Sequence, residues 1–491
     1  MCLYLFLARS DIVHLRVFHK CMLENNQNPN GRLNDDLLNQ IERMLQSKQS
    51  QYLDCDLFEE AIDFHLDENK LDKAEKIIHV ALEIHPDTCS LFLRKAQLKS
   101  LLHEDDEAKT FLEKAEFLEP SNGDIHLAKG MLFSKSGNTP EAISSYKKAI
   151  NNLEFPEDAF PYLAFEYRNQ GAYDDALMYL EKYLELISDD EMSINLYFVC
   201  CEIVSSYDRG IEFLEKMTDQ SPYCANLWFH LGLLYKYKKD YKQAYVAFEY
   251  AHLIDEGFVA AYHEMAFILM ELNEFRKAAS ILEQVALLED PYAYTFLQLA
   301  KCNRELSQDR EWMKYAALAK KEDPQMDEAW FELGKSFLKL NCLDEALEAF
   351  QKAVDLDTEN LDFNLQICQI HIRNKNWESA YELMSSLESK GEVSTSFYKL
   401  FLSVLSKLEK FELGVEMGEK ALKLFVKQVD ILYLLTYLCH MSNQNDKAIS
   451  YFEQVYFESP QLLSKYSYLL KDFLLNEEIL QIINRKGKNE F

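Results

Sequence analysis

Two short stretches contain residue types that could support chemistry. Gly334-Lys335-Ser336 has the end of a phosphate-binding loop, and His263-Glu264 begins an H-E-x-x-H zinc motif. The phosphate loop, however, needs a leading glycine where this chain has Ala329, and the zinc motif needs a second histidine where it has Phe267. We therefore predict no metal site, no cofactor and no catalytic centre.

The cysteines and the paired acidic residues have simpler explanations. The sequence contains 11 cysteines without a C-x-x-C motif, and Cys200 and Cys201 fall within a predicted helix as small apolar residues. Free thiols in this number are typical of a reducing compartment, so we expect a cytoplasmic protein. Paired acids such as Asp105-Asp106 stand at predicted turns between helices, where aspartate caps a helix start. We therefore do not expect an enzyme.

The helices that must position any binding residue are clearest between Ala225 and Phe258. This stretch is typical of two amphipathic helices joined by a turn at Lys239 and Asp240. Its small and apolar residues recur three or four positions apart, which gives each helix one buried stripe. These residues are Trp228, Leu231, Gly232, Tyr235, Ala244, Phe248 and Ala251.

The same pattern returns every 34 residues, without insertion or deletion, in twelve windows from Cys55 to Leu462. Position 20 of the window, where the two helices of a pair cross closely, is almost always small. It holds Ala74, Ala108, Ala142, Ala176, Gly210, Ala244, Ala278, Trp312, Ala346, Ala380, Gly414 and Ala448. At the exception, position 24 holds Ala316 instead of a large residue, so we predict that Trp312 fills the space that Ala316 leaves.

Proline placement and the repeat positions point to a known family. Five of the ten prolines occupy position 32, where a residue without an N–H can end one helix and open the next. The small and apolar positions 4, 7, 8, 11, 20, 24 and 27 are those of the tetratricopeptide repeat, so residues 55–462 resemble that family. The resemblance implies an all-α fold: a right-handed α-solenoid superhelix of about twelve tandem helix-turn-helix repeats with terminal capping helices.

The segments outside the repeats are short. We expect residues 1–32 to be a disordered lead-in, with translation beginning at either Met1 or Met22. Residues 33–54 are expected to form an N-terminal capping helix, and residues 463–491 to form closing helices and a tail. The apolar residues assigned to these two caps are Leu37, Leu38, Ile41 and Leu45, and Tyr466, Leu469, Leu470, Phe473 and Leu474.

Charge and hydropathy narrow the range of partners. The formal net charge of −30 argues against a nucleic-acid partner, because phosphate binding needs a basic surface. No run of eighteen apolar residues occurs, so we predict no membrane insertion. We expect protein partners.

In the family that this chain resembles, the first helix of each repeat lines a concave groove through positions 2, 5, 9, 12 and 13. These positions are acidic in the first window, mostly apolar in windows two to seven and basic in windows eight to eleven. The groove residues that we predict to bind a partner are Phe165, Phe229, Leu233, Tyr237, Phe267, Lys301, Arg304, Lys335, Lys339, Arg373, Lys399 and Lys407. No asparagine occurs at position 9, so the clamp with which some family members hold a chaperone C-terminus is not supported.

These observations predict a non-catalytic scaffold or adaptor. Its groove would bind an extended or helical segment that carries acidic and apolar residues. Two alternatives stay open: a substrate-docking or regulatory subunit of an enzyme complex, and a structural protein that self-assembles end to end. A homodimer through a terminal repeat is a further expectation. We expect the eighth window, with Trp312 and Asn303 at atypical positions, to be the weakest interface.

Overall fold

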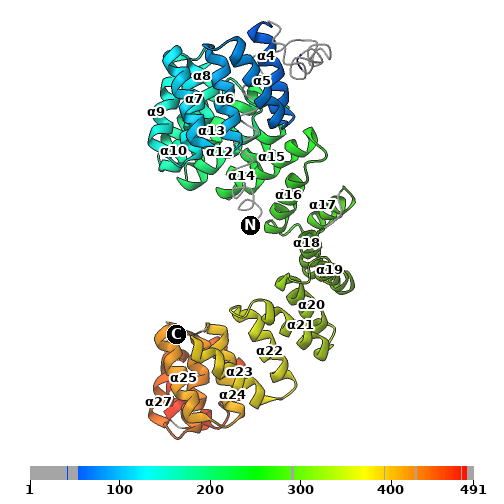
Figure 1. The fold of residues 1–491 in the computed structure, drawn as a ribbon. Helices are drawn as coiled ribbons and strands as arrows, with labels where there is room; N and C mark the ends of the chain where they lie inside the picture. The colour runs from blue at the N-terminus through cyan, green and yellow to red at the C-terminus, as the bar shows by residue number, and fades with distance from the viewer. Residues whose placement is uncertain are drawn as a thin grey trace. The chain divides into compact units, whose positions relative to one another are not determined.

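The computed structural model describes Ile41 and residues 53–288, 292–391, 393–425, 428–476 and 478–483. Within these residues every regular element is a helix, and helices α4 to α27 follow one another as pairs (Figure 1). The chain divides into two compact units, Met1–Glu264 and Met265–Phe491. Where the helices lie wholly within one unit, the second helix of a pair packs on its own first helix and on the first helix of the next pair. This tandem packing is that of an α-solenoid, and its right-handed coiling stays a prediction.

The helix bounds follow the 34-residue register. The first helices are α4 Cys55–Asp67, α6 Cys89–Leu101, α8 Gly123–Lys135, α10 Phe160–Gln170, α12 Glu191–Ile203, α14 Ala225–Tyr237, α16 Val259–Glu271, α18 Ala293–Glu305, α20 Asp327–Lys339, α22 Leu361–Arg373, α24 Thr395–Lys407 and α26 Val429–Met441. The second helices are α5 Leu71–Ile84, α7 Asp105–Leu118, α9 Thr139–Asn152, α11 Tyr173–Leu184, α13 Tyr207–Gln220, α15 Tyr241–Ile254, α17 Phe275–Leu288, α19 Asp309–Glu322, α21 Leu343–Leu356, α23 Trp377–Lys390, α25 Phe411–Leu424 and α27 Asn445–Glu458. No helix among the described residues is both long enough and apolar enough to cross a membrane. The division into twelve repeats with two caps stays a prediction.

The same tight turn joins the two helices of each pair. Position 15 of every window has a positive φ, although only Gly137 and Gly171 are glycines there. The next residue donates its backbone N–H to a carbonyl five residues earlier, as Asp240 does to Tyr235 at 2.9 Å. Because a left-handed residue with a side chain costs about 1–2 kcal/mol, this hydrogen bond and the packing of the following helix must hold the turn. The predicted turn at Lys239, whose φ is 62°, is confirmed.

The small residues of position 20 are buried where the helices cross. All nine alanines of that column have no exposed surface. A Cβ added to Gly210 would lie 2.8 Å from the Leu234 Cδ1 atom, so even a methyl group would be crowded there. Trp312 is buried in a cluster with Ala300, Ala316 and Leu333, which confirms that it occupies the space beside Ala316.

A glycine at position 8 leaves room for an aromatic side chain at position 24. Gly232 at position 8 faces the ring of Phe248 at position 24, and Gly334 faces Phe350 in the same way. Gly130 faces Tyr146. A missing side chain on the first helix therefore admits an aromatic ring from the second helix, which lets the two backbones approach closely.

The fourth pair departs from the predicted register. The pattern places its first helix from residue 157, but the structure has a 3-10 helix, Pro156–Ala159, before α10 begins at Phe160. Pro161 lies in the first turn of α10, the part of a helix that tolerates a residue without an N–H. Two prolines five residues apart thus shorten this helix at its start.

The C-terminal segment covers the last helix pair with several short helices. Its described elements are the 3-10 helix Pro460–Leu462, α28 Leu463–Tyr466 and the 3-10 helix Phe473–Leu475, and residues 478–483 are also helical. Tyr466, Leu470 and Phe473 are nevertheless buried in the same cluster as Phe452. Of the proposed N-terminal cap, only Ile41, Leu53 and Asp54 lie among the described residues, and Ile41 and Leu53 are buried with Phe58.

The fit between positions 8 and 24 predicts a compensated pair of substitutions. In Gly232→Ala the new Cβ would lie 2.6 Å from the Phe248 ring, so we expect a net destabilisation of about 1–2 kcal/mol even after the better helix propensity of alanine. Adding Phe248→Leu should recover part of this loss, since the chain uses the Ala and Leu combination at Ala164 and Leu180. Amide hydrogen exchange in α14 and α15 of both single variants and the double variant measures the effect. Additive losses would contradict the predicted contact.

Candidate partner-binding surface

The predicted binding residues all lie on first helices, but some of them are packed inside the stack. Leu233 on α14 is 7% exposed. The ring of Phe229, also on α14, lies 5.6 Å from the ring of Phe248 and 4.9 Å from that of Phe258. Phe165 on α10 is half-buried, with the Arg168 guanidinium 4.7 Å from its ring centroid. Leu233 and Phe229 therefore stabilise the stack more than they form a surface.

Two of the predicted aromatic residues remain exposed. Tyr237, the last residue of α14, is 43% exposed and stacks on Tyr207 at 5.7 Å. Its hydroxyl donates to Glu202 at 2.5 Å, and partial burial together with this hydrogen bond raises the pKa of Tyr237. Phe267 on α16 is 38% exposed. Tyr237 in the first unit and Phe267 in the second are thus the predicted aromatics that a partner could reach most easily.

Part of the predicted basic zone is neutralised by a carboxylate that sequence reasoning missed. Glu332 on α20 is 3% exposed and accepts hydrogen bonds from Trp312 Nε1 at 3.0 Å, from Lys335 Nζ at 3.1 Å and from Arg304. Burial disfavours the charge on Arg304, but the Glu332 and Glu305 carboxylates outweigh it and raise the Arg304 pKa. The eighth window, expected to be a weak interface, therefore contains a buried polar network that joins α18, α19 and α20.

Two further lysines of the predicted zone form ion pairs with the next first helix. Lys301 contacts Glu328 at 2.6 Å, and Lys399 contacts Asp430 at 2.6 Å. Asp430 also accepts hydrogen bonds from Lys465 at 2.9 Å and from Tyr466. Burial opposes ionisation of Asp430, but these three donors outweigh it and lower the pKa of the carboxyl group. Lys301 and Lys399 therefore contribute to the stack before any partner arrives.

The remaining predicted cations form what we call the cationic column: Lys339, Arg373 and Lys407. They are the last residues of α20, α22 and α24, occupy position 13 in three successive windows, and are exposed. Within the described part of the chain, no carboxylate lies within ion-pair distance of any of the three. Met441, which is 42% exposed, continues the column on α26, and Leu340 beside Lys339 is 41% exposed.

The acidic first window is also partly neutralised. Arg94 on α6 holds both carboxylate oxygens of Asp63 at 2.8 and 2.7 Å and contacts Glu59 at 3.0 Å. Burial disfavours its charge, but Asp63 and Glu59 outweigh that effect and raise the Arg94 pKa. Such a bidentate pair ties α4 to α6 and leaves Asp56 exposed.

The Gly334-Lys335-Ser336 stretch is part of the packing of α20, and the two adjacent cysteines are buried. Gly334 lies inside α20 and faces Phe350 of α21. The buried Ser336 hydroxyl donates to the Leu333 carbonyl at 2.7 Å. No group of three or more metal-binding side chains occurs among the described residues. Burial raises the pKa of Cys201 to about 12 and that of Cys200 to about 11, so neither thiol is activated for nucleophilic attack.

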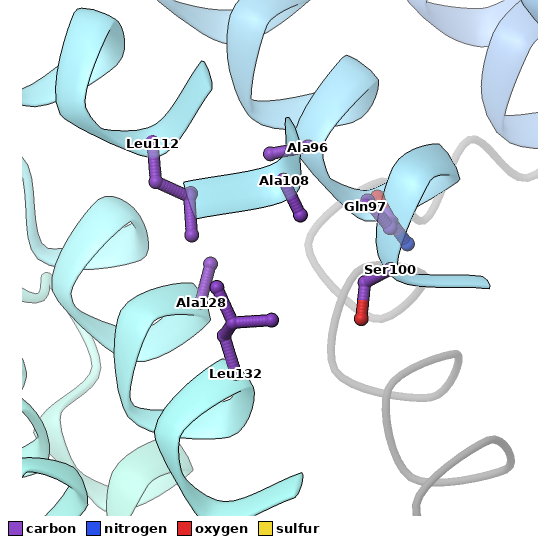
Figure 2. A pocket seen from close by; sticks show the side chains of 7 residues that line it. All are labelled: Ala96, Gln97, Ser100, Ala108, Leu112, Ala128 and Leu132. Atoms are coloured by element: carbon purple, nitrogen blue, oxygen red, sulfur yellow. The ribbon is translucent and has the colours of Figure 1, made fainter. Parts of the chain in front are cut away.

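A small pocket lies between α6, α7 and α8 (Figure 2). Its lining residues are Ala96, Gln97, Ser100, Ala108, Leu112, Ala128 and Leu132. Figure 2 shows the polar Gln97 and Ser100 at one side and Leu112 at the other. The second repeat has Ala96 and Leu112 at positions 8 and 24, where the next repeat has glycine and tyrosine. Leu112 is smaller than that tyrosine, and the space it does not fill is part of the pocket.

Comparisons with known proteins agree on the repeat. Two models described as tetratricopeptide repeat match the chain, over residues 237–299 and 327–360. The TPR repeat-containing protein MJ1428 of Methanocaldococcus jannaschii is 23% identical over 234 residues, which are 45% of this chain and 41% of that relative. The chain thus spans less than half the length of MJ1428. The TPR repeat-containing protein YpiA of Bacillus subtilis is 20% identical over 369 residues, or 74% of this chain and 78% of YpiA.

One similar chain among the solved structures aligns with most of this protein. It belongs to the APC/C hetero-tetramer Cut9-Hcn1 and has a TM-score of 0.40 and 13% identity. The match covers 89% of this chain and 98% of that one.

The network around Glu332 predicts a local effect on stability. Glu332→Gln would leave Arg304 and Lys335 without their shared buried counter-charge, so we expect α18 to α20 to lose about 2–4 kcal/mol of stability against opening. Native-state amide hydrogen exchange in these helices measures that free energy. Glu328→Gln, which removes only the exposed partner of Lys301, is the matched control and should cost about 1 kcal/mol or less. Equal effects would show that the buried network does not hold this interface.

Proposed function

Because this chain is a tetratricopeptide repeat protein, we propose that it is a non-catalytic scaffold that binds an acidic and apolar segment of a partner protein. The site is the surface at the ends of its first helices. In this proposal the scaffold acts as an adaptor in the cytoplasm. All nine described cysteines are free thiols, which is typical of a reducing compartment. The chain supplies no chemistry of its own in this proposal.

The observation that carries the proposal is the cationic column. In a chain with a net charge of −30, most of the predicted groove cations are already paired with carboxylates of the same molecule. Lys339, Arg373 and Lys407 are exposed instead, in three successive repeats and at the same position. Such a column attracts a segment with several carboxylates, and the exposed Leu340 and Met441 beside it favour apolar neighbours in that segment.

The repeat spacing suggests what this segment looks like. Packed helices lie on the order of 10 Å apart, and an extended chain advances about 3.3 Å per residue. A partner in extended conformation would therefore meet one cation of the column about every third residue. A segment with acidic residues at that spacing, separated by leucine or alanine, is the simplest match.

A cation at the end of a helix also stabilises the helix dipole, so the test must separate a binding role from this structural one. The position of a charge reversal separates the two roles. Charge reversal at a binding surface releases the ligand, whereas charge reversal elsewhere on the same unit has little effect. The second helices also have exposed lysines for that comparison, among them Lys321, Lys390 and Lys423.

Charge reversal of the column gives the direct test. The probe is a fluorescein-labelled synthetic peptide with glutamate at every third position between leucine and alanine, and binding is followed by fluorescence anisotropy at low and at physiological salt. The variant Lys339→Glu, Arg373→Glu and Lys407→Glu should weaken binding at least tenfold, because three attractions become repulsions.

The control variant Lys321→Glu, Lys390→Glu and Lys423→Glu makes the same change in net charge on second helices. It should change binding less than threefold. An equal loss of binding in both variants would mean that net charge alone explains the effect. Unchanged binding in the column variant would show that the cationic column does not bind the peptide.

A further inference from the structure

Helix α6 has a lysine at a position that packs between helices in most of the chain. Position 7 holds a buried apolar residue in ten of the twelve windows, and the other two windows have Lys95 on α6 and Lys129 on α8. Both lysines are half-buried. A charged side chain in such a column needs a counter-charge or another means of becoming neutral.

The two lysines differ in their partners. Lys129 contacts the carboxylate of Glu116 on α7. Among the described residues, no carboxylate lies within ion-pair distance of Lys95. Lys99, one helical turn after Lys95, instead contacts three carboxylates: Glu75 at 3.2 Å, Glu104 at 2.6 Å and Glu107 at 3.2 Å. Lys95 is therefore the lysine of this column that has no counter-charge in contact.

The Lys95 amine lies over an aromatic ring. Its Nζ atom is 4.5 Å from the ring centroid of Phe111, and the Nζ atom of Lys114 is 5.1 Å from the same centroid. Phe92 stacks on Phe111, with the two ring centroids 6.3 Å apart. Two positive charges thus share one ring, and the attraction of such a ring for an ammonium group is only about 0.5–1 kcal/mol. The ring does not replace a carboxylate.

These surroundings disfavour the charged form of Lys95. Partial burial removes water from its amine, and the positive charges of Lys99 and Lys114 repel it. Together these effects outweigh the attraction of Glu75 and Glu107 and lower the pKa of Lys95. A lysine that is partly desolvated and placed beside other cations is a better nucleophile at neutral pH, because more of its amine is neutral.

The charged groups that join α6 to its other neighbours are paired. Glu59 and Asp63 on α4 contact Arg94 at 3.0 and 2.7 Å. On α8, Lys135 contacts Asp105 of α7 at 2.8 Å. These ion pairs hold the helices around Lys95 together and leave its amine without a partner of opposite charge.

We propose that Lys95 is a modification site whose amine is acylated by a short-chain acyl thioester. The lone pair of the neutral amine attacks the carbonyl carbon of the thioester. A C–N bond forms, the C–S bond breaks, and the leaving thiolate takes up the proton that the amine loses. The products are an amide on Lys95 and a free thiol, so the step needs no oxidant or reductant.

The product fits this position better than the amine does. An amide has no charge, so acylation ends the repulsion between Lys95 and its neighbours Lys99 and Lys114. It also brings position 7 of α6 closer to the apolar character of that column, with the rings of Phe92 and Phe111 beside the new alkyl group. This site lies in the first unit and does not rest on the proposed peptide site, which lies in the second.

Acetylation of the full chain by acetyl-coenzyme A tests the proposal. Mass spectrometry follows the occupancy of each lysine with time between pH 7 and pH 10. At pH 7.5 Lys95 should be acetylated at least ten times faster than Lys129, because Glu116 occupies the Lys129 amine. The rate at Lys95 should level off at a lower pH in the native chain than in denaturant, where the two lysines should react alike.

Two substitutions of exposed residues should move the Lys95 rate in opposite directions. Lys114→Gln removes a repelling charge, so the pKa of Lys95 should rise and acetylation at pH 7.5 should slow at least twofold. Glu75→Gln removes an attracting charge, so the pKa should fall further and acetylation should become at least twofold faster. Lys109→Gln, another exposed lysine of α7, is the matched control and should leave the rate unchanged.

Equal acetylation rates of Lys95 and Lys129 in the native chain would overturn the proposal. A fast Lys95 whose pH profile is the same in Lys114→Gln, Glu75→Gln and the wild type would also overturn it, because access alone would then explain the rate.

Discussion

The close crossing of two short helices is the constraint on which the rest of this structure depends. At position 20 the backbones approach so nearly that a fully buried alanine is the usual limit, and a Cβ on Gly210 would already be crowded. Position 8 then decides what position 24 can be, as Gly232 admits the ring of Phe248. No pair could bury its apolar stripe alone, so each depends on its neighbours, and the left-handed turn at position 15 keeps every pair in the same geometry.

The same packing determines where charge can be used. Residues on consecutive first helices meet at sequence separations near 28 and 31, as in Arg304 with Glu332 and Lys399 with Asp430. Arg94 and Asp63 are also 31 residues apart. Cations with a carboxylate at these separations join repeats to each other. Cations without one, such as those of the cationic column, stay available on the surface.

The helix register could be predicted almost residue by residue, since the small residues, the turn and the prolines act locally. The fourth pair was the exception, because Pro156 and Pro161 shift the start of α10 to Phe160. The site was harder to predict. The sequence placed every candidate on a first helix but did not separate the packed Phe229 from the exposed Tyr237, or the paired Lys335 from the exposed Lys339. Phe229 is packed by a ring on another helix, whereas Lys335 pairs with Glu332 one turn away on its own helix. For Lys301, Arg304 and Lys399 a search for opposite charges near 28 and 31 residues away would have revealed the partner.

The central claim is that pairing within the array decides which cations a partner can reach. Lysine acetylation rates in the native chain, followed by mass spectrometry, test it most directly. Lys339 and Lys407 should react faster than Lys335 and Lys399, whose amines contact Glu332 and Asp430, and the difference should vanish in denaturant. If Lys335 and Lys399 react as fast as Lys339 in the native chain, the claim is wrong.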